Sequence, residues 1–131
     1  MQPPDRPFRP SKHTVGSRGE ALAADYVTHK GAHVVYRNLK LGPLEIDIAA
    51  RWGSEWVLIE VKTLTAQTAD ASPELGLTPA KQAALRRAAE AFEHAGYNPE
   101  GLPLRLDLAA VLLLPGGAHH LRYYPDAVQP G

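Results

Sequence analysis

The sequence of 131 residues contains no cysteine. This absence excludes structural disulfides, thiolate zinc sites and cysteine nucleophiles, and it fits a protein of the reducing cytoplasm. Long hydrophobic runs are also missing, since the longest, at 108–114, has the length of a strand and not of a membrane span. Residues 1–13 lack the apolar stretch of a secretory signal. We therefore expect a cytoplasmic protein that does not enter a membrane.

The sequence also has no net charge, because 14 Lys and Arg residues balance 14 Asp and Glu residues. A neutral total provides no global attraction to nucleic acid. The charges are unevenly spread, however, and residues 1–40 contain seven basic side chains against three acidic ones. A local basic surface would bind phosphates, whereas an ordinary surface of mixed charge would show the same counts. Both interpretations stay open.

The length and the hydrophobic fraction of 44% predict one folded domain with its own core. Residues 1–13 are rich in Pro and Arg and show no periodicity, so we expect a flexible arm there and a single domain over 14–131. The domain should begin with a helix at about 17–30, in which Ser17 and Glu20 have the spacing of a capping box.

The remaining elements follow from hydrophobic alternation and turn residues. Thr78 and Pro79 are typical of an N-cap and a first helical residue, and Gly96 would end the helix that they begin. Strands are expected at 33–38, 44–50, 55–63, 104–114 and 119–124. The order αβββ-α-ββ predicts an α/β fold in which both helices cover the sheet, because neither can bury its apolar stripe alone.

A two-residue turn at Gly53 and Ser54 would set the register of the hairpin between 44–50 and 55–63, since a type II′ turn has glycine at its first central position. This register pairs Trp52 with Glu55, Arg51 with Trp56, Ala49 with Leu58, Asp47 with Glu60, and Glu45 with Lys62. One face then holds an apolar set, namely Leu44, Ile46, Ile48, Val57, Ile59 and Val61. The other face holds the four charged residues at the end away from the turn.

Asp47 opposite Glu60 would bring two like charges to cross-strand distance, which is destabilising. A shared proton, exposure to water, or a divalent cation such as Mg²⁺ would each relieve the repulsion. With a cation, Lys62 would lie beside the metal and stabilise charge on a phosphate or a hydroxide. The alternative is a solvated sheet face with a Glu45–Lys62 salt bridge, which also stays open.

The hairpin residues Asp47, Glu60 and Lys62 resemble the signature of the PD-(D/E)XK nuclease superfamily. Over nearly the whole chain after the arm, the sequence is similar to the YraN-like family of uncharacterised bacterial proteins, which are regarded as related to endonucleases. The residues that carry this resemblance are Gly16, Gly19, Glu20, Ala23, Tyr26, Gly31, Arg37, Asn38, Glu45, Ile46, Asp47, Ile48, Ile59, Glu60, Val61, Lys62, Thr63, Lys81, Arg105, Leu106 and Asp107. Archaeal Holliday-junction resolvases share the arrangement of a helix glutamate, an E-I-D strand and an E-V-K strand.

The resemblance implies a restriction-endonuclease-like fold, with a mixed central sheet flanked by helices. It implies that Asp47 and Glu60 bind Mg²⁺ or Mn²⁺ and that Lys62 is the catalytic lysine. Glu20 would join the catalytic group from the first helix, with Glu45 as a supporting acid. A role for Glu20 in the capping box is the alternative, and the two roles are compatible.

Two positions depart from the family pattern. Leu44 occupies the place of a glycine before the E-I-D stretch, and Leu64 occupies a place that is often basic. Both would change how a phosphate backbone approaches the site. Candidate phosphate contacts are Arg37, Lys40 and Lys81, of which Lys81 follows the family pattern and the other two have an ordinary surface role as the alternative.

Other chemistry-bearing residues favour structural roles. Arg105 and Asp107 share one face of their strand, so we expect them to pair with each other. Trp52 and Trp56 flank the hairpin turn, where packing against a helix is the stronger expectation and stacking on bases the weaker. The six histidines form no close constellation of metal ligands in the sequence.

Together these features predict a metal-dependent endonuclease that hydrolyses phosphodiester bonds in DNA, with branched or structured DNA as the substrate. A homodimer would suit such an enzyme, because a resolvase cuts two strands symmetrically. The alternative is a non-catalytic module that binds nucleic acid or protein and retains the nuclease fold. The neutral total charge and Leu64 favour this alternative.

Overall fold

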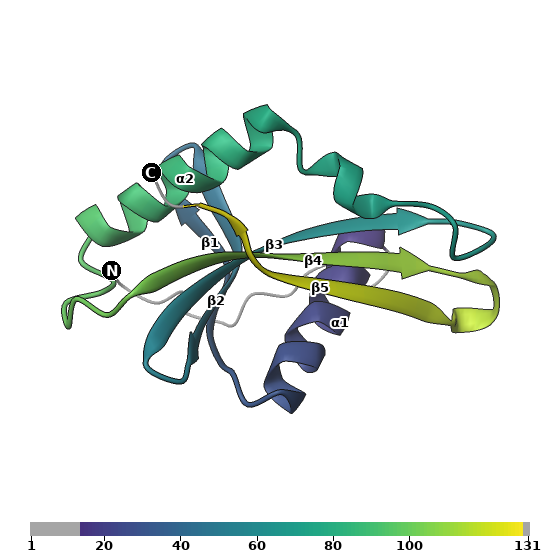
Figure 1. The fold of residues 1–131 in the computed structure, drawn as a ribbon, viewed down its shortest axis with the longest axis horizontal. Helices are drawn as coiled ribbons and strands as arrows, with labels where there is room; N and C mark the ends of the chain where they lie inside the picture. The colour runs from purple at the N-terminus through teal and green to yellow at the C-terminus, as the bar shows by residue number, and fades with distance from the viewer. Residues whose placement is uncertain (1–13, 130–131) are drawn as a thin grey trace.

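The computed structural model describes residues 14–129, so the arm expected over 1–13 lies outside the described residues (Figure 1). In chain order the elements are α1 (Val15–His29), β1 (His33–Leu41), β2 (Leu44–Trp52), β3 (Glu55–Thr65), the short helix η1 (Pro73–Gly76), α2 (Pro79–His94), β4 (Leu104–Leu113), the short helix η2 (Pro115–Gly117) and β5 (His119–Val128). The predicted order αβββ-α-ββ and the α/β class are confirmed. Among the described residues, no helix is long and apolar enough to cross a bilayer.

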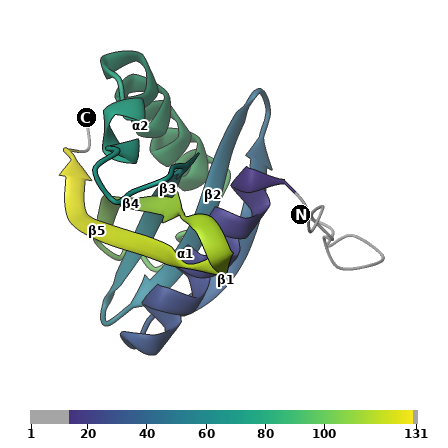
Figure 2. The same ribbon diagram turned by 90° about the vertical axis from the view of Figure 1, so that its right-hand side faces the viewer.

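The five strands form one mixed sheet in the order β1-β2-β3-β4-β5. β3 and β4 are parallel, whereas the other neighbouring strands are antiparallel. A parallel pair needs a crossover connection, and α2 supplies it. α1 lies on one face of the sheet and α2 on the other (Figures 1 and 2). Both helices therefore cover the sheet, as predicted.

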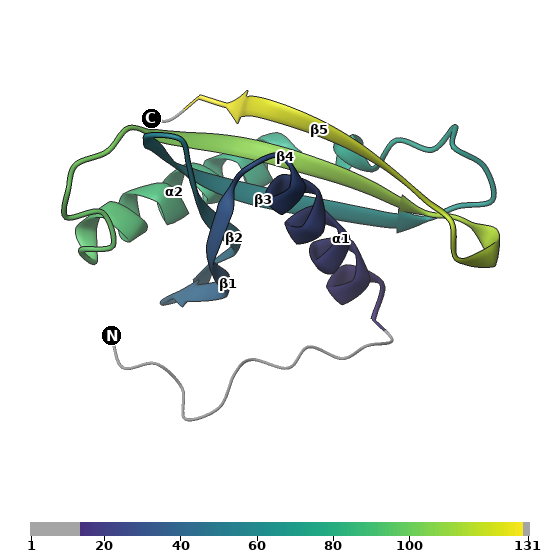
Figure 3. The ribbon, with the colours of Figure 1, turned by 90° about the horizontal axis from the view of Figure 1, so that it is seen from below.

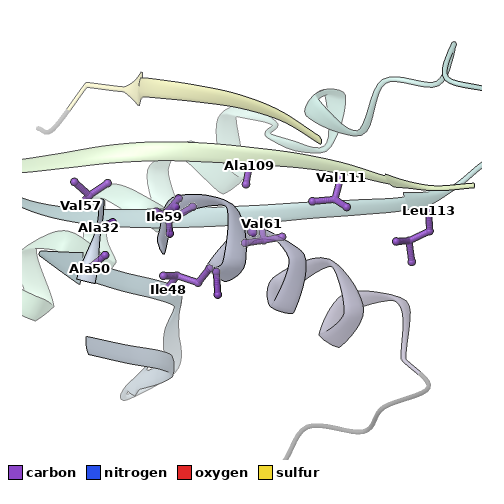
Figure 4. Packing of buried hydrophobic residues seen from close by; sticks show 12 residues of the cluster. Ala32, Ile48, Ala50, Val57, Ile59, Val61, Ala109, Val111 and Leu113 are labelled. Carbon is purple, nitrogen blue, oxygen red and sulfur yellow. The ribbon is translucent and has the colours of Figure 1, made fainter. Parts of the chain in front are cut away.

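Each face of the sheet has its own hydrophobic core. On the α1 side, Val27 of the helix belongs to one cluster with Val57 and Ile59 of β3. Figure 4 shows these two residues of β3 with others of the cluster. On the α2 side, Phe92 of the helix belongs to a second cluster with Leu58. Neighbouring residues of β3 thus point into different cores, and the strand is buried on both faces.

The predicted division of the hairpin into an apolar face and a charged face is wrong in part. Ile46 belongs to the core under α2, although it was expected to share a face with Ile48, which belongs to the core on the α1 side. The face with Asp47 and Glu60 is not open either, because Leu58 on β3 is fully buried beneath α2. Apolar and charged residues therefore occur together under this helix.

The predicted register is confirmed only next to the turn. Trp52 pairs with Glu55, and the ladder continues as far as Ile48 and Ile59. Gly53 has a φ of 61°, as a type II′ turn requires. The predicted backbone pairs Asp47–Glu60 and Glu45–Lys62 are absent from this ladder.

The reason is that β2 and β3 separate beyond Ile48. β2 stays paired with β1 as far as its pair Leu41–Leu44, whereas β3 stays paired with β4 as far as Thr65. The hairpin of β1 and β2 consequently bends away from the other strands (Figure 3). The charged residues of the hairpin lie where the two strands part.

The predicted start of the first helix is also wrong. Thr14 is the N-cap of α1, and its hydroxyl accepts a hydrogen bond from the backbone N–H of Ser17 at 3.1 Å. Ser17 and Glu20 therefore do not form a capping box, and Glu20 lies further along the helix. The prediction for α2 is confirmed, since the Thr78 side chain accepts from the N–H of Lys81 at 3.2 Å and Pro79 is the first helical residue.

Candidate functional site

The separation of β2 and β3 forms one wall of a cavity of about 310 Å³, and the start of α2 forms the opposite wall. Glu45 and Asp47 line it from β2, Glu60 lines it from β3, and Lys81 lines it from α2. Four of the predicted site residues thus surround one cavity, although they come from three elements. Three acids and one ammonium facing a shared space are the charges expected of a site for a cation and a phosphate.

Asp47 is the most perturbed acid of this cavity. Its Oδ2 accepts a hydrogen bond from the backbone N–H of Val61 at 2.8 Å, which takes the place of the missing ladder contact. Burial raises the pKa of Asp47 to about 8, and the charge of Glu60 adds to the rise, with smaller contributions from Glu20 and Glu45. At neutral pH this carboxyl group therefore holds a proton, unless a cation takes the place of that proton.

Glu60 and Lys62 form an ion pair, with Oε2 and Nζ 2.9 Å apart. Their side chains are 17% and 21% exposed, so the solvated face considered as an alternative is wrong for these two residues. The Glu45–Lys62 salt bridge that belonged to this alternative is also wrong, because Lys62 pairs with Glu60 and Glu45 pairs with Lys40. The stem of Lys62 lies against Gly76 of η1, where an added Cβ would come within 3.2 Å of Lys62 Cδ. Lys62 is thus held by Glu60 at its ammonium group and by Gly76 along its stem.

Asn38 connects the helix glutamate to the cavity. Its amide nitrogen donates to Glu20 Oε1 at 2.8 Å and to Glu45 Oε2 at 3.3 Å. Its Oδ1 is buried and has no hydrogen-bond partner. In the sequence, Asn38 is identified only as one position of the family resemblance. The sequence signal for its role is that an asparagine stands inside a strand. Asparagine tolerates a positive φ, and Asn38 has a φ of 51°.

Gly19 allows α1 to approach the sheet closely enough for Glu20 to reach Asn38. A Cβ at Gly19 would lie 1.8 Å from Thr63 Oγ1, which no real packing tolerates. Glycine at this position is therefore required by the contact between α1 and β3. It is the residue next to Glu20, so the close approach also places this glutamate.

The three predicted phosphate contacts lie in different surroundings. Lys81 lines the cavity, as described above. Lys40 is 74% exposed and pairs with Glu45 at 2.6 Å, at the outer side of the site. Arg37 is not among the residues that line the cavity, and its Nε and Nη2 are buried without hydrogen-bond partners. Lys81 is thus the one of these three that faces Asp47 and Glu60.

The expected structural roles are confirmed for Arg105, Asp107 and Trp56, whereas Trp52 meets a residue of a strand and not of a helix. The Arg105 guanidinium binds Asp107 through two hydrogen bonds of 2.8 Å. Trp56 is 5% exposed and packs edge-on against Phe92 of α2. Trp52 packs against Tyr123 of β5.

The acids of the cavity fit a hard divalent cation. Within residues 14–129, no three or more His, Asp or Glu side chains converge into a ready-made metal site. A magnesium-type ion needs only one or two carboxylates, because water and substrate phosphate supply its other oxygen ligands. Asp47 and Glu60 meet this requirement, and burial together with the charge of Glu60 raises the pKa of Asp47, a shift that a nearby cation would reverse.

Comparison with known proteins identifies relatives over most of the chain. The family model described as "Uncharacterised protein family UPF0102" matches residues 19–111, which include all the predicted site residues. A UPF0102 protein of Pelobacter propionicus is 31% identical over 98% of this chain and 92% of its own length. One of Streptomyces coelicolor is 40% identical over 82% of this chain and 83% of its own length. A UPF0102 protein of Leifsonia xyli is 39% identical over 77% of this chain and 84% of its own length.

Proposed function

We propose that this chain, which belongs to the uncharacterised protein family UPF0102, is a metal-dependent endonuclease that hydrolyses phosphodiester bonds in DNA. The observation that carries the proposal is the cavity shared by Asp47, Glu60 and Lys81. It combines a pair of cation-binding acids with a positive charge on the opposite wall. The resemblance of Asp47, Glu60 and Lys62 to the PD-(D/E)XK signature supports the same chemistry.

Asp47 and Glu60 would hold Mg²⁺ or Mn²⁺. When bound, such an ion polarises the scissile phosphate and acidifies a water molecule. The chain contributes the positions of the two acids. The backbone N–H of Val61 fixes one oxygen of Asp47, and the half-buried position of Glu60 on β3 directs it to the same cavity.

Two lysines would act directly on the substrate. Lys62 lies beside Glu60 and would orient the attacking water or stabilise the charge that develops on the phosphate. Lys81 enters the cavity from α2 and would bind a phosphate oxygen, since an ammonium group is a compact donor to phosphate. Glu20 and Glu45, joined through Asn38, would keep the surroundings of Asp47 negative and so strengthen cation binding.

Branched or structured DNA is the substrate that we propose, by analogy with the Holliday-junction resolvases. The analogy rests on the shared arrangement of a helix glutamate, an E-I-D strand and an E-V-K strand.

The proposal is tested by incubating labelled single-stranded, duplex, flap and four-way-junction DNA with the protein in Mg²⁺, Mn²⁺ or EDTA. We expect cleavage with the metals, none in EDTA, and loss of cleavage in Glu60→Ala. Glu90→Ala is the matched control, because Glu90 is exposed on α2 and does not line the cavity. Cleavage that survives in Glu60→Ala would contradict the proposal.

A non-catalytic binding module is the second candidate, favoured by the two ion pairs beside the cavity. Lys40 and Lys62 are each already neutralised by a glutamate. A folded wild type that binds DNA in a salt-dependent manner but cleaves none of the substrates would favour this candidate.

A further inference from the structure

A second cavity, of about 700 Å³, lies at the other end of α2. It is lined by the aromatic residues Tyr36, Trp56 and Tyr97, and by the charged residues Arg51 and Glu100. Its volume lies in the range of small-molecule sites, which combine apolar and aromatic walls with a few polar groups. The nuclease chemistry proposed above uses none of these residues.

The aromatic rings form a continuous packed group beside the cavity. The ring of Tyr36 stacks on that of Trp56, with centroids 6.3 Å apart, and meets the ring of Tyr97 edge-on at 5.2 Å. Rings that support one another in this way are rigid. Rigid aromatic faces suit planar ligands, because stacking then needs little reorganisation of the protein.

Arg51 lies over Trp56 in the way that a planar ligand would. Its guanidinium carbon is 5.4 Å from the centre of the Trp56 ring. Its Nη1 reaches Glu100 at 3.1 Å, but the two side chains are 35% and 59% exposed, and exposed ion pairs contribute little stability. The ion pair with Glu100 therefore adds little to the contact with Trp56 in holding the arginine in place.

Two donors at this place have no partner. Trp56 Nε1 and Arg51 Nε are both buried and have no hydrogen-bond partner. Trp56 as a whole is only 5% exposed, so water does not replace the missing partner. Buried donors in folded proteins are nearly always satisfied, and leaving them unpaired is costly. An outward movement of Arg51 would expose both donors to a ligand with hydrogen-bond acceptors.

We infer that this cavity binds a nucleobase of the DNA strand whose phosphate occupies the cavity of Asp47 and Glu60. The inference rests on the proposed function. A nucleobase supplies the planar ring, and acceptors such as N7 and O6 of guanine match a site with two donors.

The spacing of the two cavities fits one strand. Trp56 and Glu60 both lie on the α2 side of β3, four residues apart, which corresponds to about 13 Å at 3.3 Å per residue. A strand whose base is unstacked into the aromatic cavity covers this distance within a few nucleotides. The aromatic cavity would therefore select the position of the cut relative to a base that lies a few nucleotides away.

The test uses the emission of Trp56 in the inactive full-length protein. Trp52→Phe in a Glu60→Gln background leaves Trp56 as the sole tryptophan of the chain. A short single-stranded oligonucleotide is titrated in Mg²⁺, with free dGMP in a parallel titration. We expect saturable quenching by the oligonucleotide, and about tenfold weaker binding of dGMP, which lacks the linked phosphates.

A cavity-filling variant provides the matched comparison. Ala95 lines the cavity and is exposed, so Ala95→Phe should fill it without disturbing the core. We expect Ala95→Phe to weaken oligonucleotide binding about tenfold, the size of one lost base-stacking contact. Ala118→Phe, at an exposed position in the turn between β4 and β5, should leave binding unchanged.

The outcomes separate this inference from the nuclease proposal. The inference would be overturned if the oligonucleotide binds without changing the Trp56 emission and if Ala95→Phe and Ala118→Phe bind it with equal affinity. This holds even if the wild type cleaves DNA. Binding of dGMP as tight as that of the oligonucleotide would overturn the coupling to a strand. Quenching that Ala95→Phe weakens would support the inference, even if the wild type cleaves nothing.

Discussion

Asp47 is the residue on which the account of the site depends. Burial and the neighbouring Glu60 raise its pKa from 3.8 to about 8. The folded protein therefore holds the Asp47 proton more tightly than the unfolded chain does. Without metal, the free energy of unfolding should fall as the pH rises from about 4 to about 8, by about 1 kcal/mol per pH unit.

Asp47→Asn tests this dependence, because an amide stays neutral and keeps an oxygen for the N–H of Val61. We expect the variant to be more stable than the wild type at pH 8 and to lose most of the decline between pH 5 and pH 8. Urea unfolding in EDTA across this range measures the difference. If the free energy of unfolding falls with pH equally in the two proteins, Asp47 does not hold the proton.

Lys62 should matter for cleavage and not for cation binding. Lys62→Met keeps most of the stem that packs against Gly76 but removes the ammonium beside Glu60. We expect cleavage to fall about 100-fold or more, with Mn²⁺ affinity retained. Lys81→Met is the comparison, and it should chiefly raise the KM for DNA. Unchanged cleavage in Lys62→Met would remove this lysine from the mechanism.

At the residue scale, the sequence predicted the main acids but not their connections. Alternation and the resemblance both selected Asp47, Glu60 and Lys62, because period-two spacing survives when a register changes. The role of Asn38 was hidden, since it depends on a backbone φ of 51° that places its amide between Glu20 and Glu45. No local pattern in the sequence specifies such a bridge.

At the scale of elements, the contact between α1 and β3 places Glu20. Gly19→Ala would put a methyl group 1.8 Å from Thr63 Oγ1, so the helix must move outward. We expect a loss of about 2–3 kcal/mol in the free energy of unfolding. Weaker cleavage should accompany it, because Glu20 moves with the helix.

Gly16→Ala is the matched control for this prediction. It lies in the same helix, and a Cβ there would meet nothing within 4 Å. The control should be neutral or more stable by about 0.5–1 kcal/mol, as alanine favours helix over glycine. Equal effects of the two substitutions in chemical unfolding would contradict the close packing of α1 on β3.

The connection between β3 and α2 is held by the edge strand β5. Arg122 binds both carboxylate oxygens of Glu74 at 2.8 and 3.0 Å, and Tyr124 donates to the same carboxylate. The Arg122 guanidinium lowers the pKa of Glu74 to about 2, so Glu74 stays charged throughout the physiological range. The same short helix carries Gly76, which lies against Lys62.

Arg122→Gln should therefore loosen this connection and, through it, Lys62. We expect faster hydrogen exchange in residues 66–78 and a several-fold drop in cleavage, with the exchange of β3 and β4 unchanged. Arg87→Gln, at an exposed position on α2, is the control. Exchange in 66–78 that matches the wild type would show that the Arg122–Glu74 contact does not hold the connection.

The elements themselves were largely predictable, whereas the divergence of two strands was not. Periodicity placed α2 correctly, and Gly53 with Ser54 identified the hairpin turn. The β2–β3 ladder nevertheless ends at Ile48, although β3 continues along β4 and β2 continues along β1. Where a hairpin bends out of its sheet depends on the packing on both faces, and the pattern of its two strands does not contain this information.

At the scale of the whole molecule, the sheet separates two helices and α2 spans two cavities. Charged residues gather at the start of α2, and aromatic residues gather at its end. Both cavities lie on the same face of the sheet, which is the arrangement that one bound strand would need. A homodimer stays a prediction, and light scattering of the protein with and without a four-way junction would test it.

The central claim is that Asp47 and Glu60 bind one divalent cation. Its most direct measurement is calorimetric titration of Mn²⁺ at pH 7 in buffers of different ionisation enthalpy. We predict saturable binding with release of nearly one proton, because the cation displaces the proton held by a carboxyl group whose pKa is about 8. Asp47→Asn should abolish both the binding and the proton release, whereas Glu90→Gln should change neither. Absence of binding at millimolar Mn²⁺, or equal binding by Asp47→Asn, would contradict the account.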